Sequence, residues 1–247
     1  MDSFDAAPLK RALACDSIGE ALLALSATLS DRSDAISVGR ELLDGLALEV
    51  RESTTTAIID TLFGHDGFRG DVIDYHAEEN SLLDRVLERR VGMPITLSAV
   101  VIEVGRRLDL PLRMVAMPGH VVVGTAKPNW FIDAFGGVEV DSDGLQRRFA
   151  SIFGSDASLR AHELEDLDPV GAVNRVCNNL MRTWGTDRTG KLDRLLALRA
   201  EIPGSEADRK LVLGVAQARG RFDIAATIRE SVDPDDPEIE DLWARLN

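Results

Sequence analysis

The chain has 247 residues, 45% of them hydrophobic, and its 28 basic and 42 acidic side chains give a formal net charge of −14. A chain this acidic repels phosphate backbones, so we do not expect nucleic acid as a partner. The acidic N-terminus lacks the features of a signal peptide, no apolar run reaches the roughly 18 residues of a membrane span, and two cysteines give neither disulfide nor metal spacing. We therefore expect a cytoplasmic protein with no membrane contact, no metal and no cofactor.

The N-terminal third of the sequence has the apolar spacing of helices. Ser17 and Glu20 have capping-box spacing ahead of the first apolar face, and Asp34 is placed to cap a second helix. A third helix is predicted around residues 57–62 and a fourth over Ser81–Arg90. We expect residues 1–34 to form a helical segment ahead of a domain that spans residues 35–160.

The sequence pattern changes after residue 90. Pro94 follows a break at Gly92 and stands at the start of an apolar stretch, which predicts a buried helix over Ile95–Leu108. Strands are predicted at Leu112–Ala116, Val121–Gly124 and Asn129–Asp133, with a turn at Pro118–Gly119 and a short amphipathic helix over Leu145–Phe153. The prediction is an α+β core in which a central helix packs on a small antiparallel sheet.

From about Pro169 the pattern is helical to the last residue. Helices are predicted near residues 170–184, 191–200, 206–219, 222–231 and 237–246. The residues around Gly220 resemble the turn of a helical-hairpin repeat, so we expect residues 168–247 to form a separate helical tail. Because such repeat units need neighbours to bury their apolar faces, we expect the tail to pack on the central domain.

His120 and Asp133 are the best candidates for chemistry. If the second hairpin places Gly124 opposite Asn129, counting back along both strands places His120 opposite Asp133 on one face of the sheet. The carboxylate would then hold one imidazole nitrogen and leave the other free to act as a base. The alternative is a pair of strand-end side chains with unrelated solvent contacts, since a one-residue slip in register would separate their faces.

Three motifs in order resemble the SirB-type branch of the transglutaminase-like superfamily. They are Arg89–Ser98, Pro118–His120 and Phe131–Gly137, with Tyr75 and Asn80–Leu83 fitting the segment upstream. The resemblance covers about residues 35–155 and implies a transglutaminase-like core followed by tetratricopeptide-like helices, whose start matches Asn174–Leu180. It also implies that His120 and Asp133 are the superfamily's histidine and aspartate.

The resemblance implies a third catalytic group that this chain lacks. Papain-like thiol enzymes of the superfamily place a cysteine at the N-terminus of the helix before the strands, where the helix dipole and the histidine lower its pKa. In this sequence that position falls near Pro94, which has no nucleophilic side chain. Thr96 and Ser98 lie in the same first turn, where hydroxyls more often bond to the backbone, and Cys177 and Cys15 are poor substitutes.

Two further motif residues, Asn80 and Arg90, are expected to have structural roles rather than catalytic ones. Asn80 is placed to cap a helix that begins at Ser81, and Arg90 to pair with a carboxylate near the cleft. The histidines and acidic residues between His65 and Glu79 lack the spacing of a metal site.

The sequence favours a transglutaminase-like protein that has lost thiol chemistry and acts as a non-catalytic binding or regulatory protein, with a protein or peptide as its partner. The alternative is a hydrolase or acyltransferase in which His120, oriented by Asp133, activates Thr96, Ser98 or a water. A third interpretation is a scaffold with no ligand, which predicts no pocket beside His120.

Overall fold

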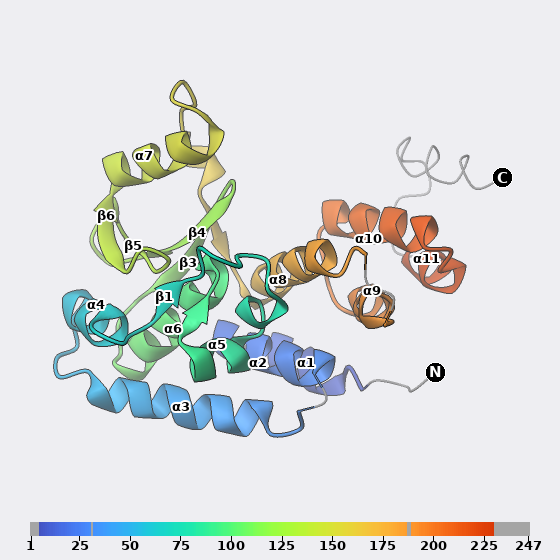
Figure 1. Ribbon diagram of the computed structural model, residues 1–247, viewed down its shortest axis with the longest axis horizontal. Helices are drawn as coiled ribbons and strands as arrows, with labels where there is room; N and C mark the ends of the chain where they lie inside the picture. The colour runs from blue at the N-terminus through green and yellow to red at the C-terminus, as the bar shows by residue number, and fades with distance from the viewer. Residues whose placement is uncertain (1–4, 31, 187–188, 230–247) are drawn as a thin grey trace.

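The computed structural model describes residues 5–30, 32–186 and 189–229 (Figure 1). The N-terminal part contains helices α1 (Ala7–Leu13), α2 (Ile18–Leu29), α3 (Ala35–Glu49), α4 (Thr55–Phe63) and α5 (Leu83–Arg89), with the 3-10 helix η1 (Glu78–Asn80) before α5. Two short strands, β1 (Arg69–Gly70) and β2 (Val91–Gly92), form a parallel pair on either side of η1 and α5 in the sequence. The central helix α6 (Pro94–Arg107) follows directly after β2.

A five-stranded antiparallel sheet follows, with strand order β6-β5-β4-β3-β7. Its strands are β3 (Arg113–Met117), β4 (His120–Gly124), β5 (Trp130–Asp133), β6 (Val138–Asp141) and β7 (Glu165–Leu167). Helix α7 (Ser142–Phe153) and the 3-10 helix η2 (Ala161–Glu163) connect β6 to β7. The tail contains α8 (Pro169–Thr183), α9 (Lys191–Glu201), α10 (Glu206–Ala218) and α11 (Phe222–Arg229). The α+β class and its order of parts are confirmed, while the helix predicted near 237–246 lies outside the described residues.

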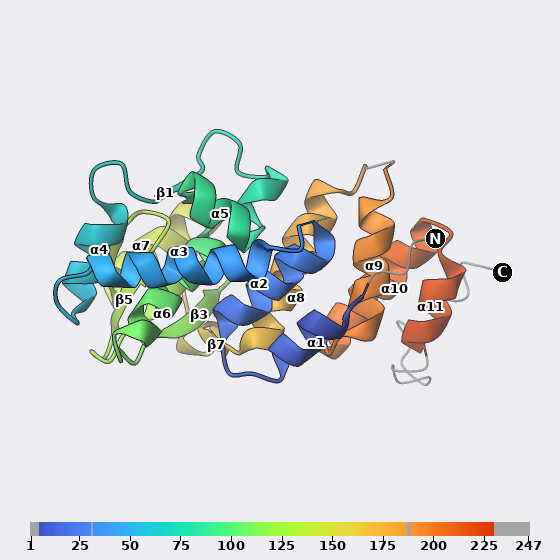
Figure 2. The same ribbon diagram turned by 90° about the horizontal axis from the view of Figure 1, so that it is seen from below.

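The sheet lies between α6 on one face and α7 on the other. Its side chains alternate between two clusters, as the two-residue period of a strand requires. Val115, Met117, Val122 and Phe131 pack against Leu145 and Phe149 of α7, whereas Met114, Val121, Val123 and Ile132 join the main core with α6. Every residue of α6 from Pro94 to Gly105 is buried, because helices α2, α3, α4 and α5 cover the faces that the sheet leaves open (Figure 2).

The hairpin between β4 and β5 has a different register from the predicted one. Gly124 lies opposite Phe131 and Val123 opposite Ile132, so the predicted pairing of Gly124 with Asn129 is wrong by two residues. A slip of two residues preserves the face of every side chain. His120 and Asp133 therefore lie on the same face as predicted, but diagonally across the strands rather than directly opposite.

Two strands of the five-stranded sheet were absent from the sequence-based prediction. Both β6 and β7 are short, and each contains acidic residues and lies at an edge of the sheet. Acidic residues are depleted in strands, and a segment of three or four residues carries little periodicity. The pairing partners, and not the local sequence, define these strands.

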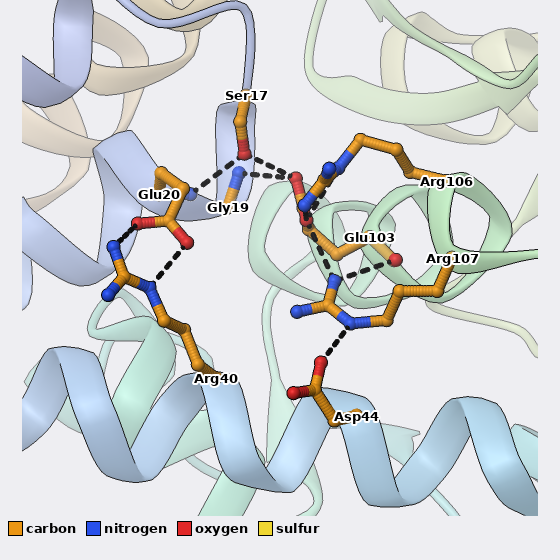
Figure 3. Close-up of polar contacts among 8 residues, drawn as sticks. All are labelled: Ser17, Gly19, Glu20, Arg40, Asp44, Glu103, Arg106 and Arg107. Atoms are coloured by element: carbon orange, nitrogen blue, oxygen red, sulfur yellow. Dashed lines mark hydrogen bonds and ion pairs between the residues drawn. The ribbon is translucent and has the colours of Figure 1, made fainter.

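A buried carboxylate fixes α6 against α2 (Figure 3). Glu103 of α6 accepts hydrogen bonds from the Ser17 hydroxyl (2.8 Å) and the Gly19 amide (3.0 Å), while Arg106 and Arg107 pair with its other oxygen. A Cβ atom on Gly19 would lie 2.2 Å from the Cγ atom of Glu103, so a glycine is needed for this close approach. Ser17 also caps α2 through the Glu20 amide, as the capping-box spacing predicted.

The tail packs on the rest of the chain mainly through its first helix, and α9 also contacts α2. Helix α8 contacts α2, and the side chain of Arg175 donates hydrogen bonds to the carbonyl oxygens of Met117 and His120. The remaining helices extend away from the sheet, each packed on the one before it (Figure 1). Among the helices that the structure describes, none is long and apolar enough to cross a membrane.

Candidate functional site

The side chains of His120 and Asp133 form a hydrogen-bonded pair. His120 opens β4 after a two-residue turn at Pro118–Gly119, in which Gly119 has a positive φ of 74° that glycine adopts without strain. Its Nε2 atom lies 2.9 Å from Oδ1 of Asp133 at the end of β5. The predicted pairing of these two residues is thus present, although through a different register.

The environment of Asp133 keeps its carboxylate ionised. Burial alone would raise its pKa, but the hydrogen bond and electrostatic interaction with His120, the positive charge of Arg148 and the Gly136 amide outweigh that effect and lower the pKa of Asp133. An ionised carboxylate only accepts hydrogen bonds, so Nε2 of His120 carries the proton that it donates. In the neutral imidazole Nδ1 then has the lone pair, and this atom makes no hydrogen bond with any described residue.

A cleft of about 330 Å³ lies beside this pair. Met93, Pro94 and Ile95 at the start of α6 line it, together with His120 and the turn before it. The cleft brings the superfamily's histidine position and the helix N-terminus together, which the resemblance implied. Its presence argues against a scaffold without any pocket beside His120.

Pro94 occupies the position from which a nucleophile would face this cleft. Thr96 is fully buried, and its hydroxyl donates to the Asn80 carbonyl (2.7 Å) and accepts from the Met93 amide, an arrangement that stabilises the first turn of α6. Ser98 is also fully buried, and neither hydroxyl lines the cleft. The geometry therefore offers neither Thr96 nor Ser98 to a ligand.

Neither cysteine supplies the nucleophile that the cleft lacks. Cys177 lies in the core on α8, where burial raises the pKa of its thiol to about 12, and it does not line the cleft. Cys15 is exposed near the end of α1 and also lies outside the cleft. A thiol with a pKa this high is protonated at neutral pH and cannot act as a nucleophile.

Asn80 and Arg90 have structural roles that differ from the predicted ones. Helix α5 begins at Leu83 without a side-chain cap, so the prediction that Asn80 caps a helix at Ser81 is wrong. The buried Asn80 amide instead donates to Asp71 and to the carbonyl of Asp74, which holds the loop before η1. Arg90 ends α5 in a left-handed conformation, is exposed, and lies over the Phe68 ring rather than against a carboxylate.

Most of the residues that line the cleft were not assigned to the site from the sequence. Tyr75 comes from the loop before η1, and Arg175, Asn179 and Arg182 come from α8. Their spacing is helical, i, i+4 and i+7, so a polar stripe on one face of the first tail helix was the available signal. The packing of α8 against the core decides which part of the protein this stripe faces, and the local sequence pattern does not predict that packing.

The end of α8 also anchors the segment that carries Tyr75 and His76, two further lining residues of the cleft. The Thr183 hydroxyl donates to the His76 carbonyl (3.0 Å), and the Trp184 indole donates to Glu78 (2.7 Å). The cleft therefore lies between the core and the tail, and both parts contribute to it. Within the described part of the chain, no group of three or more histidine, cysteine, aspartate or glutamate side chains could hold a metal ion.

Comparison with known proteins gives relatives in several bacteria. A UPF0162 protein of Xylella fastidiosa is 34% identical over 161 residues, which cover 61% of this chain and 57% of that protein. A UPF0162 protein of Haemophilus influenzae is 30% identical, over 66% of this chain and 64% of its own length. Protein SirB1 of Salmonella typhimurium is 24% identical, over 75% and 72% respectively. With the first two relatives, the match spans less than two thirds of the relative's own length.

No solved structure matches the chain. The family model described as the transglutaminase-like superfamily matches residues 21–178, which begin in α2 and end in α8. The matched region contains the His120–Asp133 pair, the start of α6 and, of the α8 stripe, Arg175. More than half of the chain is thus matched, and the protein belongs to the transglutaminase-like superfamily, with homologues among the UPF0162 and SirB1 proteins.

Proposed function

We propose that this chain is a non-catalytic member of its superfamily that holds a protein or peptide segment in the cleft beside His120. One observation carries the proposal: the cleft contains the histidine, paired with its aspartate, but no cysteine, serine or threonine among the described residues that line it. Covalent thiol chemistry requires a nucleophile within hydrogen-bond reach of the base, and Pro94 cannot supply one.

The His120–Asp133 hydrogen bond has a role that needs no chemistry. It joins the start of β4 to the end of β5, and Asp133 also accepts hydrogen bonds from the amides of Phe135 and Gly136. These contacts fix the imidazole, leaving Nδ1 as a hydrogen-bonding group for a ligand in the cleft. A rigid donor or acceptor in a concave site is how proteins orient what they bind.

A hydrolase that uses His120 to activate water is the second candidate function. The observation that favours it is the same pair, because an imidazole oriented by a carboxylate through Nε2 has its basic Nδ1 available. Tyr75 also lines the cleft, but burial raises the pKa of its phenol, which therefore stays protonated at neutral pH and is a poor base or nucleophile.

The two functions are separated by turnover measurements on purified protein. A panel of amide, ester and thioester substrates with chromogenic leaving groups is incubated with the wild type, with His120→Ala, and with His162→Ala as the control. His162 is an exposed histidine that does not line the cleft. We expect the same background rate in all three.

Turnover in the wild type that His120→Ala abolishes and His162→Ala preserves would overturn the proposal in favour of the hydrolase. Turnover that iodoacetamide abolishes and that also depends on His120 would show thiol chemistry from a cysteine, again against the proposal. Equal background rates for all three proteins across the panel support a binding role.

A further inference from the structure

The cleft beside His120 carries positive charge, although the chain as a whole is strongly acidic. Arg175 and Arg182 line it, and no aspartate or glutamate is among the described lining residues. The chain has 42 acidic residues, so a cleft without any acidic lining residue differs from the rest of its surface. Such a local field attracts anions even when the net charge of the protein is −14.

Neither arginine forms an ion pair within the described part of the chain. Arg182 makes no hydrogen bond and no ion pair there, and its side chain is exposed at the cleft. Arg175 uses Nη2 to donate to the carbonyl oxygens of Met117 and His120, and it forms no ion pair.

Other arginines of the same tail pair with carboxylates. Arg199 lies 3.0 Å from Asp208, and Arg219 lies 2.9 Å from Asp193. The tail therefore supplies acidic partners where its arginines are structural. The absence of such partners at the cleft, among the described residues, distinguishes Arg175 and Arg182 from them.

The positive charge of Arg175 is only partly compensated. Burial lowers the pKa of Arg175, and this effect with the repulsion from Arg182 outweighs the attraction of Tyr75 and Glu165. A half-buried charge without an ion-pair partner destabilises the folded state, and an anion that binds between the two guanidinium groups would relieve that cost. The planar guanidinium fork matches a carboxylate through two parallel hydrogen bonds.

We propose that the cleft recognises a peptide through a carboxylate group held by Arg175 and Arg182. This inference rests on the proposed binding function and names its chemistry. The cavity of about 330 Å³ is of ligand size and exceeds what a lone carboxylate fills. Its apolar wall at Met93–Ile95 suits the aliphatic part of a peptide, and the Asn179 amide is placed among the polar groups that a peptide backbone needs.

The carboxylate has two possible sources, a peptide C-terminus or an acidic side chain. Four probes separate them: N-acetylated tetra-alanine with a free C-terminus, the same peptide with a C-terminal amide, an amidated peptide with one alanine replaced by glutamate, and inorganic phosphate. Each is titrated into ¹⁵N-labelled full-length protein, and the side-chain signals of His120 and Arg182 report binding at the cleft.

The informative variant is Arg182→Gln, because this exposed side chain has no described partner whose loss could unfold the protein. Arg11→Gln is the matched control, an exposed arginine on α1 that makes the same change in net charge and does not line the cleft. Arg175→Lys keeps the positive charge but removes the planar guanidinium group. This substitution also changes the hydrogen bonds of Arg175 to the Pro118–Gly119 turn, so the His120 signal of the variant is compared with that of the wild type before any probe is added.

We expect at least one carboxylate peptide to bind and the neutral amidated peptide to bind about tenfold more weakly, which is the typical effect of losing one charge-assisted hydrogen bond. Arg182→Gln should weaken carboxylate binding by a similar factor while Arg11→Gln leaves it unchanged, and added salt should weaken it in the wild type. Which peptide binds identifies the source of the carboxylate.

Equal affinity for the neutral and carboxylate peptides overturns the inference, as does equal affinity of Arg182→Gln and the wild type for the carboxylate peptides. The absence of binding by both carboxylate peptides, or tighter binding of phosphate than of any peptide, also overturns it. The proposed function fails on a different readout, turnover that depends on His120, so the two failures are distinguishable.

Discussion

Replacing Glu103 by glutamine tests how strongly the buried carboxylate holds α6 in place. The two carboxylate oxygens have separate partners: Oε1 accepts from Ser17 and the Gly19 amide, and Oε2 accepts from Arg106 and Arg107 (Figure 3). Glutamine keeps a carbonyl oxygen for the first pair and presents an amide donor to the two arginines. Glu103→Gln therefore removes the charged half of the network and retains its shape.

The expected loss follows from the exposure of the partners. Breaking a fully buried ion pair costs about 3–5 kcal/mol. Arg106 is half exposed and regains water, while the mostly buried Arg107 keeps its contacts with Asp44 and with the carbonyl of residue 103. We expect a loss of about 2 kcal/mol in the free energy of unfolding, which lowers the melting temperature of a chain this long by roughly 4–8 °C.

Urea unfolding at neutral pH measures the free energy, with Glu20→Gln as the matched control. Glu20 pairs with Arg40 in the same region but at the surface, where such pairs contribute at most about 1 kcal/mol (Figure 3). A Glu103→Gln protein that loses no more stability than Glu20→Gln would refute the assignment of Glu103 as an anchor of α6.

The pH dependence of the same variant has a definite sign. Burial would raise the pKa of Glu103, but hydrogen bonds from Arg106 and Ser17 outweigh it, and the pKa is lowered from the ordinary value of 4.5. A lowered native pKa means that the stabilisation is complete above the ordinary value and is lost as the pH falls through the native one. The difference in unfolding free energy between wild type and Glu103→Gln should therefore shrink below about pH 4.5. A constant difference down to pH 3 would contradict this mechanism.

Three further predictions follow from the site and the core. Pro94→Cys, made in a Cys15→Ser background, should place a thiol beside the imidazole of His120. Iodoacetamide should then alkylate this thiol at a pH several units below that needed for a free thiol, whose pKa is about 8.5. Adding His120→Ala should abolish this shift in the pH dependence of alkylation. Cys177 should resist thiol reagents in the native protein and react only after unfolding, because its thiol is buried with a pKa raised to about 12. Fast modification of both cysteines of the native wild type by a chromogenic disulfide reagent would contradict this. Gly19→Ala should lower the free energy of unfolding, measured in urea, by about 1–3 kcal/mol, because the new methyl group overlaps the Glu103 side chain. An unchanged free energy of unfolding would show that α2 can shift to make room for it.

Several parts of the fold follow from local sequence patterns. The start of α2 at Ser17 and of α6 at Pro94 come from capping and N-terminal proline rules, which act within one turn of helix. The turn at Pro118–Gly119 likewise needs only the positive φ that glycine allows. Local rules are reliable here because the interactions that enforce them join residues only a few positions apart.

The His120–Asp133 pair was predicted by a register that proved wrong by two residues. The prediction succeeded because side chains repeat every two residues along a strand, so an even error leaves each one on its face. Asn80 shows the opposite case. Its sequence position favours a helix cap, but in the structure its side-chain amide instead donates hydrogen bonds to Asp71 and Asp74. These bonds hold a loop whose position depends on tertiary packing.

The sequence by itself determined the α+β class, the central helix, the hairpin that carries His120 and Asp133, and the presence of Pro94 where the superfamily has a cysteine. Only the tertiary structure decided what surrounds them. Arg175 reaches the His120 carbonyl across 55 residues of sequence, and Thr183 reaches the His76 carbonyl across 107. Burial of the apolar face of α8 against the core determines where its polar stripe points. That packing depends on the summed shape and apolar surface of many distant residues, which no short segment encodes.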